Sequence, residues 1–404
     1  MKIHFLKKRI LSEIHEVSEF YQEVVFYGQV PGDDGTLERL LVHPNKRRAH
    51  TPEELGHGEY RLILMDGVFN FHLDIQELLW SLKPLLSRSD RVAVMMYNPY
   101  LRIIYRVLNF LGMRRGDLPT TFITRVDLHD LTKLSGYEVV RTRTIRFPLS
   151  ELCWLKGVLP SENRPSLSVV IPARNERGNI RPALERLGRW KHSELEIIFV
   201  EGHSSDGTWE EIQKLQQEFS PRLQVSSYRQ TGKGKNDAVR LGFSKATKDL
   251  LTILDADLTM PPELLHRFYE AYRLGVADFI NGSRLLYPME GEAMRFLNKL
   301  GNVFFSKMLS FVLSVKISDS LCGTKLLSRR DYLRVVAWRK KFGDFDPFGD
   351  FELLFPAAQM PLGIIDIPIR YLARTYGTTN IHRFRHGMML LKMTFIGFFK
   401  IKIK

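Results

Sequence analysis

The sequence has few cysteines and no long apolar run. Cys153 and Cys322 are the two cysteines of the 404 residues. Their separation and lack of ligand spacing argue against a disulfide framework or a zinc site and fit a reducing compartment. No stretch approaches the roughly 18 uncharged residues of a membrane span, and the basic N-terminus lacks the apolar core of a signal peptide. We therefore expect a cytoplasmic protein without a transmembrane helix, whose membrane contact would be peripheral.

The charge balance is basic. The net charge is +14, with 44% hydrophobic and 26% charged residues in a chain long enough for two domains. Residues 1–160 hold 22 Lys and Arg against 19 Asp and Glu, whereas residues 161–404 hold 37 against 26. The excess favours anionic partners such as nucleotides, lipid phosphates or nucleic acid, and it equally fits a generally basic surface. The basic run 46–48 is more typical of a solvated loop than of a nucleic-acid patch, so we expect no nucleic-acid partner.

Residues 58–147 alternate between strand and helix patterns. The periodicity predicts strands at 60–65 and 91–97, helices at 74–86 and 100–113, and a helix from Asp127 that Gly136 closes. This order indicates a βαβ unit and a parallel sheet. The segments LILMDGV, DIQELLWSLKPLL, RVAVMMYN and LSGYEVVRTRTI resemble the second half of a class I S-adenosylmethionine-dependent methyltransferase.

That resemblance is incomplete at its N-terminal side. The family holds its cofactor on a glycine-rich turn after a strand, but Gly28, Gly32 and Gly35 do not follow a convincing apolar strand before a helix. Residues 31–58 look irregular and exposed. We therefore expect residues 1–158 to form a truncated, inactive Rossmann-like domain that binds no S-adenosylmethionine, followed by a linker at 159–165.

The stretch LLTILDAD, residues 250–257, is the centre of the functional argument. It predicts a buried strand ending in Asp255 and Asp257, whose side chains at i and i+2 would project to the same side. Two carboxylates at the carboxyl end of such a strand suit Mg²⁺ or Mn²⁺ carrying a diphosphate. Alone, the pattern is better explained as a solvated turn after a strand, because Asp often ends strands.

Seven motifs in order surround this stretch: IPARNERGNI, VEGHSSDGT, GKGKNDAVRLGF, LDADL, NGSR, DSLCGTKLL and RTYGTTN. Over residues 166–385 they resemble family 2 glycosyltransferases of the GT-A fold, closest to the polyprenyl-phosphate branch. The resemblance implies an α/β fold, with the smaller methyltransferase-like domain in front of the GT-A domain and a basic tail at 386–404. It also implies an inverting, metal-dependent transfer from a nucleotide-sugar donor.

The motifs supply the candidate site residues. Carboxylates in the loops after adjacent strands can accept hydrogen bonds from ribose hydroxyls or a base N–H. The family more often shows Asp-Asp-Gly where this chain has Glu-Gly-His from residue 201, which leaves the base open. Asp206 is better explained as a turn or helix cap than as a ligand contact. The candidate substrate-binding residues are Pro172, Ala173, Arg174, Asn175, Glu176, Glu201, Gly234, Lys235, Asp255, Arg284, Asp319, Lys325 and Arg374, with Asp255 and Asp257 as metal ligands and Asp257, Asp350 and Glu352 as catalytic residues.

The acceptor is open between two chemistries. A hydroxyl acceptor in polysaccharide or glycolipid assembly needs a general base, for which Asp350 is the candidate. A polyprenyl phosphate is already a nucleophile at neutral pH and needs none. The basic, acid-free segment 367–404 and the apolar stripe expected on a helix at 293–317 fit a peripheral element on the inner membrane face, and core packing is the usual alternative. A non-catalytic scaffold is the alternative from another class.

Overall fold

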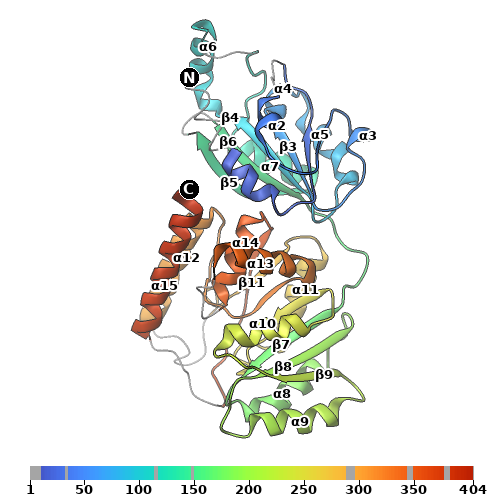
Figure 1. Cartoon of the computed structure of the whole chain (residues 1–404), viewed down its shortest axis with the longest axis vertical. Coiled ribbons are helices and arrows are strands. Elements are labelled where there is room, and N and C mark those ends of the chain that lie inside the picture. Colours follow the sequence, from blue (N-terminus) through green and yellow to red (C-terminus); the bar gives the residue numbers. More distant parts are fainter. Residues whose placement is uncertain are drawn as a thin grey trace. The chain divides into compact units, whose positions relative to one another are not determined.

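The computed structural model describes residues 11–31, 35–112, 117–146, 150–287, 296–343, 349–376 and 383–403. The chain divides into two compact units. Unit 1 comprises Met1–Leu159 with Gln359–Gly363, and unit 2 comprises Pro160–Ala358 with Ile364–Lys404. Each unit is built on its own sheet (Figure 1).

Unit 1 contains a six-stranded sheet in the order β2-β1-β3-β4-β6-β5. The first four strands in that order are parallel, and β6 runs antiparallel to both of its neighbours. The strands are β1 (Glu23–Tyr27), β2 (Lys46–Ala49), β3 (Arg61–Asp66), β4 (Arg91–Tyr97), β5 (Tyr137–Arg146) and β6 (Ser150–Gly157). Residues 11–18 are helical, and the other helices are α2 (Thr36–Leu40), α3 (Pro52–Leu55), α4 (Val68–Phe71), α5 (Ile75–Leu82), η1 (Lys83–Leu85), η2 (Pro99–Leu101), α6 (Arg102–Phe110) and α7 (Arg125–Ser135).

The βαβ unit expected at 60–97 is confirmed. β3 and β4 pair in parallel, and α5 lies between them in the chain. Asp74 caps α5 by accepting a hydrogen bond from the Glu77 backbone N–H at 2.9 Å. Gly136 ends α7 in the left-handed region at φ 74°, where a residue without a Cβ is favoured.

The expectation of an irregular, exposed segment at 31–58 is wrong. Its basic run lies in β2, an edge strand parallel to β1. Edge strands tolerate charge, and here Arg47 pairs with Glu23 at 2.8 Å and Arg48 with Glu38 at 2.6 Å. Gly28 directly follows β1, so the glycine-bearing segment does follow a strand, contrary to the sequence argument.

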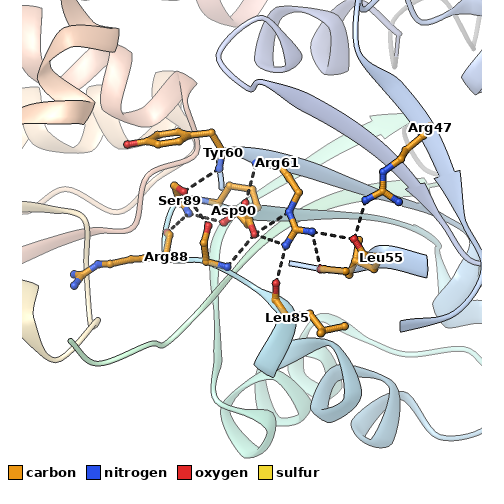
Figure 2. A network of polar contacts seen from close by, with 11 residues as sticks. Arg47, Leu55, Tyr60, Arg61, Leu85, Arg88, Ser89 and Asp90 are labelled. Atoms are coloured by element: carbon orange, nitrogen blue, oxygen red, sulfur yellow. Dashed lines mark hydrogen bonds and ion pairs between the residues drawn. The ribbon is translucent and has the colours of Figure 1, made fainter. Parts of the chain in front are cut away.

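A buried ion pair ties together the amino ends of two strands in unit 1. The Arg61 and Asp90 side chains are 2% and 0% exposed and lie 2.8 Å apart. Arg61 also donates to the backbone carbonyls of Leu55 at 3.1 Å and Leu85 at 2.7 Å, as Figure 2 shows. Asp90 accepts from the Arg61 backbone N–H at 2.8 Å. These contacts satisfy both charges, which burial would otherwise penalise.

Unit 2 contains a seven-stranded sheet in the order β13-β11-β12-β10-β7-β8-β9, with β12 antiparallel to its neighbours. The strands are β7 (Leu167–Ala173), β8 (Leu195–Glu201), β9 (Gln224–Arg229), β10 (Leu250–Ile253), β11 (Phe279–Ser283), β12 (Lys325–Ser328) and β13 (Ile364–Pro368). The helices are α8 (Arg177–Leu187), α9 (Thr208–Phe219), α10 (Lys235–Lys245), η3 (Pro262–Leu264), α11 (Leu265–Arg273), α12 (Phe296–Leu313), α13 (Arg329–Phe342), α14 (Asp350–Gln359), α15 (Arg383–Gly397) and η4 (Phe398–Ile403).

Helices cover both faces of the unit 2 sheet. Alternate residues of β7, including Val169 and Ile171, pack with α8, α9 and α11 in one core cluster. Val170 points to the other face, where it lies close to Gly242 of α10. Figure 1 shows α8 and α9 on one side of the strands and α10 on the other. The mixed α/β architecture of both units confirms the expected fold class, and it places the loops after β7, β8 and β10 along one edge of the sheet.

Candidate active site

Three adjacent strands each lead into a strained backbone position. Asn175 after β7, His203 after β8 and Leu258 after β10 have φ values of 57°, 59° and 53°. Residues with a Cβ rarely adopt this left-handed region, and such strain concentrates at functional sites. The carboxyl edge of the sheet is therefore held in a specific shape.

The two central carboxylates follow β10 rather than belonging to it. β10 ends at Ile253, so strand alternation is not what orients Asp255 and Asp257, contrary to the sequence argument. Asp255 Oδ1 forms an ion pair with Lys235. Asp257 Oδ1 accepts from the Thr259 backbone N–H at 3.1 Å and hydroxyl at 2.8 Å. A turn, and not a strand, therefore fixes the second carboxylate.

Lys235, the first residue of α10, is the ion-pair partner of Asp255. Burial opposes its charge, but the charges of Asp255, Asp350 and Asp257 outweigh burial and raise the pKa of Lys235. Lys235 also counteracts the effect of burial on Asp255, so the pKa of that carboxyl is lowered. Asp255 is the acid that contacts this ammonium group, whereas the side chains of Asp257 and Asp350 bind Arg374 and Lys325.

Gly323 approaches this pair closely. A Cβ at Gly323 would lie 2.6 Å from Asp255 Oδ2 and would clash with Lys235 Nζ. The DSLCGTK motif was read for Asp319 and Lys325, and Gly323 between them was missed. Its signal is the glycine within a motif that ends at a strand, because close backbone approach requires a residue without a side chain.

Arg374 links Glu176, in the loop after β7, to Asp257, in the turn after β10. Its guanidinium lies 2.6 Å from Asp257 Oδ2 and 3.2 Å from Glu176 Oε1. Burial raises the pKa of Glu176, against the hydrogen bond from Asn179 and the charge of Arg374. Tyr376, two residues further on, donates to Asp206 at 3.2 Å. The segment 370–376 therefore reaches the loops after β7, β8 and β10.

The loops after β7 and β8 are ordered by their own polar groups. Asn175 Oδ1 accepts from the Ser205 backbone N–H at 2.9 Å, and Glu201, 4% exposed, accepts from the Ser204 N–H at 2.5 Å. Asp206 accepts from the Thr208 N–H at 3.0 Å, which is the turn expected for it. Pro172 and Ala173 end β7, Arg174 follows them, and Gly234 precedes α10 as its N-cap at φ 89°.

Gln230 was not singled out from the sequence. It follows β9 and is 5% exposed, and its amide nitrogen donates to the Gly232 carbonyl at 3.3 Å. That acceptor fixes the orientation of the amide, and Gln230 Oε1 is buried without a partner among the described residues. The backbone N–H of Gln230 donates to the Glu201 carbonyl at 3.0 Å, so this free acceptor lies beside the second loop.

Arg284 and Asp319, both predicted to contact substrate, bind each other. Their side chains are 14% and 0% exposed, and Asp319 accepts from Arg284 Nε at 2.8 Å, the Arg284 backbone N–H at 3.0 Å and Asn302 Nδ2 at 2.8 Å. Arg284 overcomes the effect of burial and lowers the pKa of Asp319. These contacts favour a positioning role for the pair.

Lys325 and Asp350 form a second pair. The Lys325 ammonium is fully buried, 2.5 Å from Asp350 Oδ1, and it also donates to the Cys322 carbonyl. Asp350 is the first residue of α14, where a carboxylate is favoured by the helix dipole. A buried ammonium below the carboxylate holds Asp350 in place and leaves Lys325 itself out of a ligand's reach.

Glu352 is held by two arginines that the sequence did not suggest. It is 5% exposed and accepts from Arg240 Nε at 3.0 Å, Arg339 at 2.5 Å and Asn236 Nδ2 at 2.8 Å. Asn236 and Arg240 belong to α10, so Glu352 ties α14 to the helix that carries Lys235. The geometry favours a structural role over the predicted catalytic one.

The carboxylates fit a divalent cation. Asp255 and Asp257 are hard oxygen donors, and each is paired with a cation of the chain. Within the described ranges no cluster of three or more His, Cys, Asp or Glu residues could hold a metal. The chain would therefore supply two carboxylates, and a diphosphate and water would complete the coordination, as Mg²⁺ commonly requires.

Large apolar side chains are exposed on α12 and α15 of unit 2. Phe304 and Phe311 of α12 are 53% and 62% exposed, and Met388 and Phe395 of α15 are 69% and 49% exposed. The two helices pack side by side in Figure 1. No described helix combines the length and hydropathy that a membrane span requires.

A cavity of about 270 Å³ lies in unit 1, between residues 96–100 and 123–126, and not at the carboxylates.

Comparison with known proteins assigns the central part of unit 2. Residues 168–335 match the family model "Glycosyl transferase family 2". This part of the chain is a family 2 glycosyltransferase domain. The match confirms the predicted family. The matched range contains β7 to β12 and, among the site residues, Lys235, Asp255, Asp257 and Gly323. Asp350, Glu352 and Arg374 lie beyond the matched range.

Individual relatives match over different lengths. A dolichol-phosphate mannosyltransferase of Pyrococcus furiosus is 36% identical over 136 residues, which cover 33% of this chain and 37% of that protein. A dolichyl-phosphate hexose transferase of Haloferax volcanii is 26% identical over 226 residues, which cover 56% of this chain and 91% of that protein. Among solved structures, the mannosyltransferase PcManGT of Pyrobaculum calidifontis, in complex with GDP-Man and Mn²⁺, is 19% identical with a TM-score of 0.40 over 57% of this chain and 63% of that one. The chain thus spans little more than a third of the first relative and most of the second.

Proposed function

We propose that unit 2 transfers a sugar from a nucleotide diphosphate to a polyprenyl phosphate, with inversion at the anomeric carbon. The observation that carries the proposal is the pairing of Asp255 with Lys235 and of Asp257 with Arg374 at the carboxyl edge of a family 2 glycosyltransferase domain. Mg²⁺ or Mn²⁺ held by Asp255 and Asp257 would neutralise the negative charge that develops on the departing diphosphate.

The chain's own residues supply the remaining interactions. An acceptor oxygen attacks the anomeric carbon as the bond to the diphosphate oxygen breaks, and the diphosphate leaves with the electron pair. Lys235 and Arg374 lie next to the two carboxylates and are placed to bind phosphate oxygens. Glu201 and Gln230 Oε1 would accept hydrogen bonds from the ribose and the base. Lys325 and Glu352 hold Asp350 and α10 in position.

A lipid phosphate is the acceptor that the surface of unit 2 supports best. The exposed phenylalanines of α12 and α15, and the acid-free basic segment 367–404, are typical of a membrane-surface element. The relatives named above act on dolichol or dolichyl phosphate according to their names. We infer a peripheral protein on the cytoplasmic membrane face.

A transfer assay with paired acceptors tests the proposal. Purified full-length protein is given a panel of nucleotide sugars, Mn²⁺ and either a polyprenyl phosphate or the corresponding polyprenol, and products are measured by mass spectrometry. We expect transfer to the phosphate, none to the alcohol and none with EDTA. With a phosphate nucleophile, Asp350→Asn should cost less than the roughly 10²- to 10⁴-fold that loss of a general base costs. Transfer to the alcohol would contradict the phosphate acceptor, and so would the full loss in Asp350→Asn if its Tm matches that of wild type, because Asp350 is also the partner of the buried Lys325.

A further inference from the structure

Helix α6 of unit 1 turns an apolar face outward. Ile103, Val107 and Phe110 are 75%, 49% and 90% exposed, and Ile104 and Leu111 are 43% and 57% exposed. At 3.6 residues per turn these five side chains cover an arc of about 120°. In the core of a domain such a face would be buried, so it contributes nothing to the packing of unit 1.

The opposite face of α6 holds it to the unit. Tyr105 is the buried residue of the helix, and its ring lies 5.3 Å from Tyr97 and 6.2 Å from Phe122 between centroids. Its hydroxyl accepts from the Asn98 backbone N–H at 3.1 Å, and Arg102 lies over the Phe122 ring at 5.4 Å. Because this anchor is on one side, the apolar arc is fixed facing away from the unit, and α6 projects beyond the sheet in Figure 1.

The charged residues of α6 itself are of one sign. Arg102 and Arg106 are the charged residues of the helix, and both are basic. Arg102 and Arg106 are exposed and lie along one border of the apolar arc. Tyr100, immediately before the helix, is 83% exposed, and an amphipathic ring at this position suits the headgroup region of a bilayer.

The size of the face decides between a bilayer and a protein partner. A helix of nine residues is about 14 Å long, which is far short of what buries the roughly 800 Å² per partner of a stable protein interface. An interfacial helix needs only to insert its apolar side about 5–10 Å between headgroups, with arginines on lipid phosphates.

We propose that α6 is a membrane-surface helix of unit 1 that binds anionic phospholipid bilayers. Ile103, Val107 and Phe110 enter the headgroup layer, and Arg102 and Arg106 bind lipid phosphates. This contact belongs to unit 1 and is separate from the exposed face of α12 and α15. It does not depend on sugar transfer by unit 2.

A fluorescent probe on α6 tests the proposal in the full-length protein. Phe110→Cys is labelled with nitrobenzoxadiazole, and Cys153 and Cys322 are buried and will not compete for the label. The matched control is Leu73→Cys, since Leu73 is 92% exposed elsewhere in unit 1. We expect a blue shift and brighter emission at position 110 with phosphatidylglycerol vesicles, a weaker response with phosphatidylcholine alone, and no response at position 73.

Two further variants separate the apolar and charged contributions. Adding Ile103→Ser and Val107→Ser should raise the lipid concentration for half the response at least about tenfold, because about 1.4 kcal/mol of apolar burial is lost. Arg102→Gln with Arg106→Gln should reduce the preference for anionic vesicles and its dependence on salt. If position 110 responds no more than position 73 while the protein still sediments with vesicles, the proposal is wrong. A shift without lipid that grows with protein concentration would assign the face to a second copy, and it would equally overturn the proposal.

Discussion

Removing the charge of Asp319 should destabilise unit 2 strongly. Asp319→Asn keeps the shape of the side chain but leaves Arg284, whose side chain is 14% exposed, without its counter-ion. Asp319 also accepts from Asn302 Nδ2 at 2.8 Å, from the Leu321 backbone N–H at 3.0 Å and from the Arg284 backbone N–H at 3.0 Å, so the change affects three donor groups besides the pair itself. Breaking a buried pair costs about 3–5 kcal/mol, whereas an exposed pair contributes about 0–1 kcal/mol.

Thermal unfolding of the full-length protein measures the difference. For a unit of this size about 3–5 kcal/mol corresponds to a fall of roughly 6–20 °C in the Tm of its transition. The matched control is Glu218→Gln, which removes the partner of Arg181 in a pair whose side chains are 46% and 40% exposed. Its Tm should change by only a few degrees. If the two variants are equally stable, Arg284 does not depend on Asp319, and its role as a substrate contact regains support.

Three further outcomes follow from the structure. The pKa of Asp319 is lowered on folding, so the stability that its carboxylate contributes is present above its unfolded pKa of about 4 and is lost as pH falls through the lower folded pKa. The difference in free energy of unfolding between wild type and Asp319→Asn, measured with urea, should therefore shrink below about pH 4. A difference that does not shrink would show that the pKa of Asp319 is not lowered. Asp90→Asn should cost unit 1 about 3–5 kcal/mol in chemical unfolding, because Arg61 is buried against Asp90, and a loss below about 1 kcal/mol would refute this. Gly323→Ala should weaken metal-dependent nucleotide binding in calorimetry by roughly 5- to 150-fold, the equivalent of about 1–3 kcal/mol of overpacking. The control Gly301→Ala, which has open space around its Cβ, should bind as wild type. Equal binding by both variants would contradict the close approach of Gly323 to Asp255 and Lys235.

The elements that position the site could be predicted from the sequence because local patterns specify them. Apolar runs followed by polar loops mark β7 and β8, and the motifs IPARNERGNI and VEGHSSDGT begin in the last residues of these two strands. Gly136 and Asp74 mark helix ends for local reasons of backbone conformation and capping. The edge strand β2 was missed because its three basic residues do not resemble a strand, and only pairing with Glu23 and Glu38 neutralises two of them.

The partners of the site residues could not be predicted, because they are distant in the chain. Glu352 is bound by Arg240, 112 positions away, and Arg374 reaches Asp257 across 117 positions.

The apolar stripe expected on α12 also did not predict which face of the helix is buried. Its buried face carries Leu309, Val312 and Leu313, while Phe304 and Phe311 point outward, since helix periodicity gives a stripe but not the side that meets the core.

Calorimetric binding of nucleoside diphosphates in the presence and absence of Mn²⁺ tests directly whether Asp255 and Asp257 hold a divalent cation. Wild type and Glu218→Gln should bind at least one of UDP and GDP, and the affinity should fall when EDTA is added. Asp255→Asn and Asp257→Asn should each lose the metal-dependent part of the affinity and keep any metal-independent part. Binding by both Asp variants with undiminished metal dependence would show that the two carboxylates do not hold the cation.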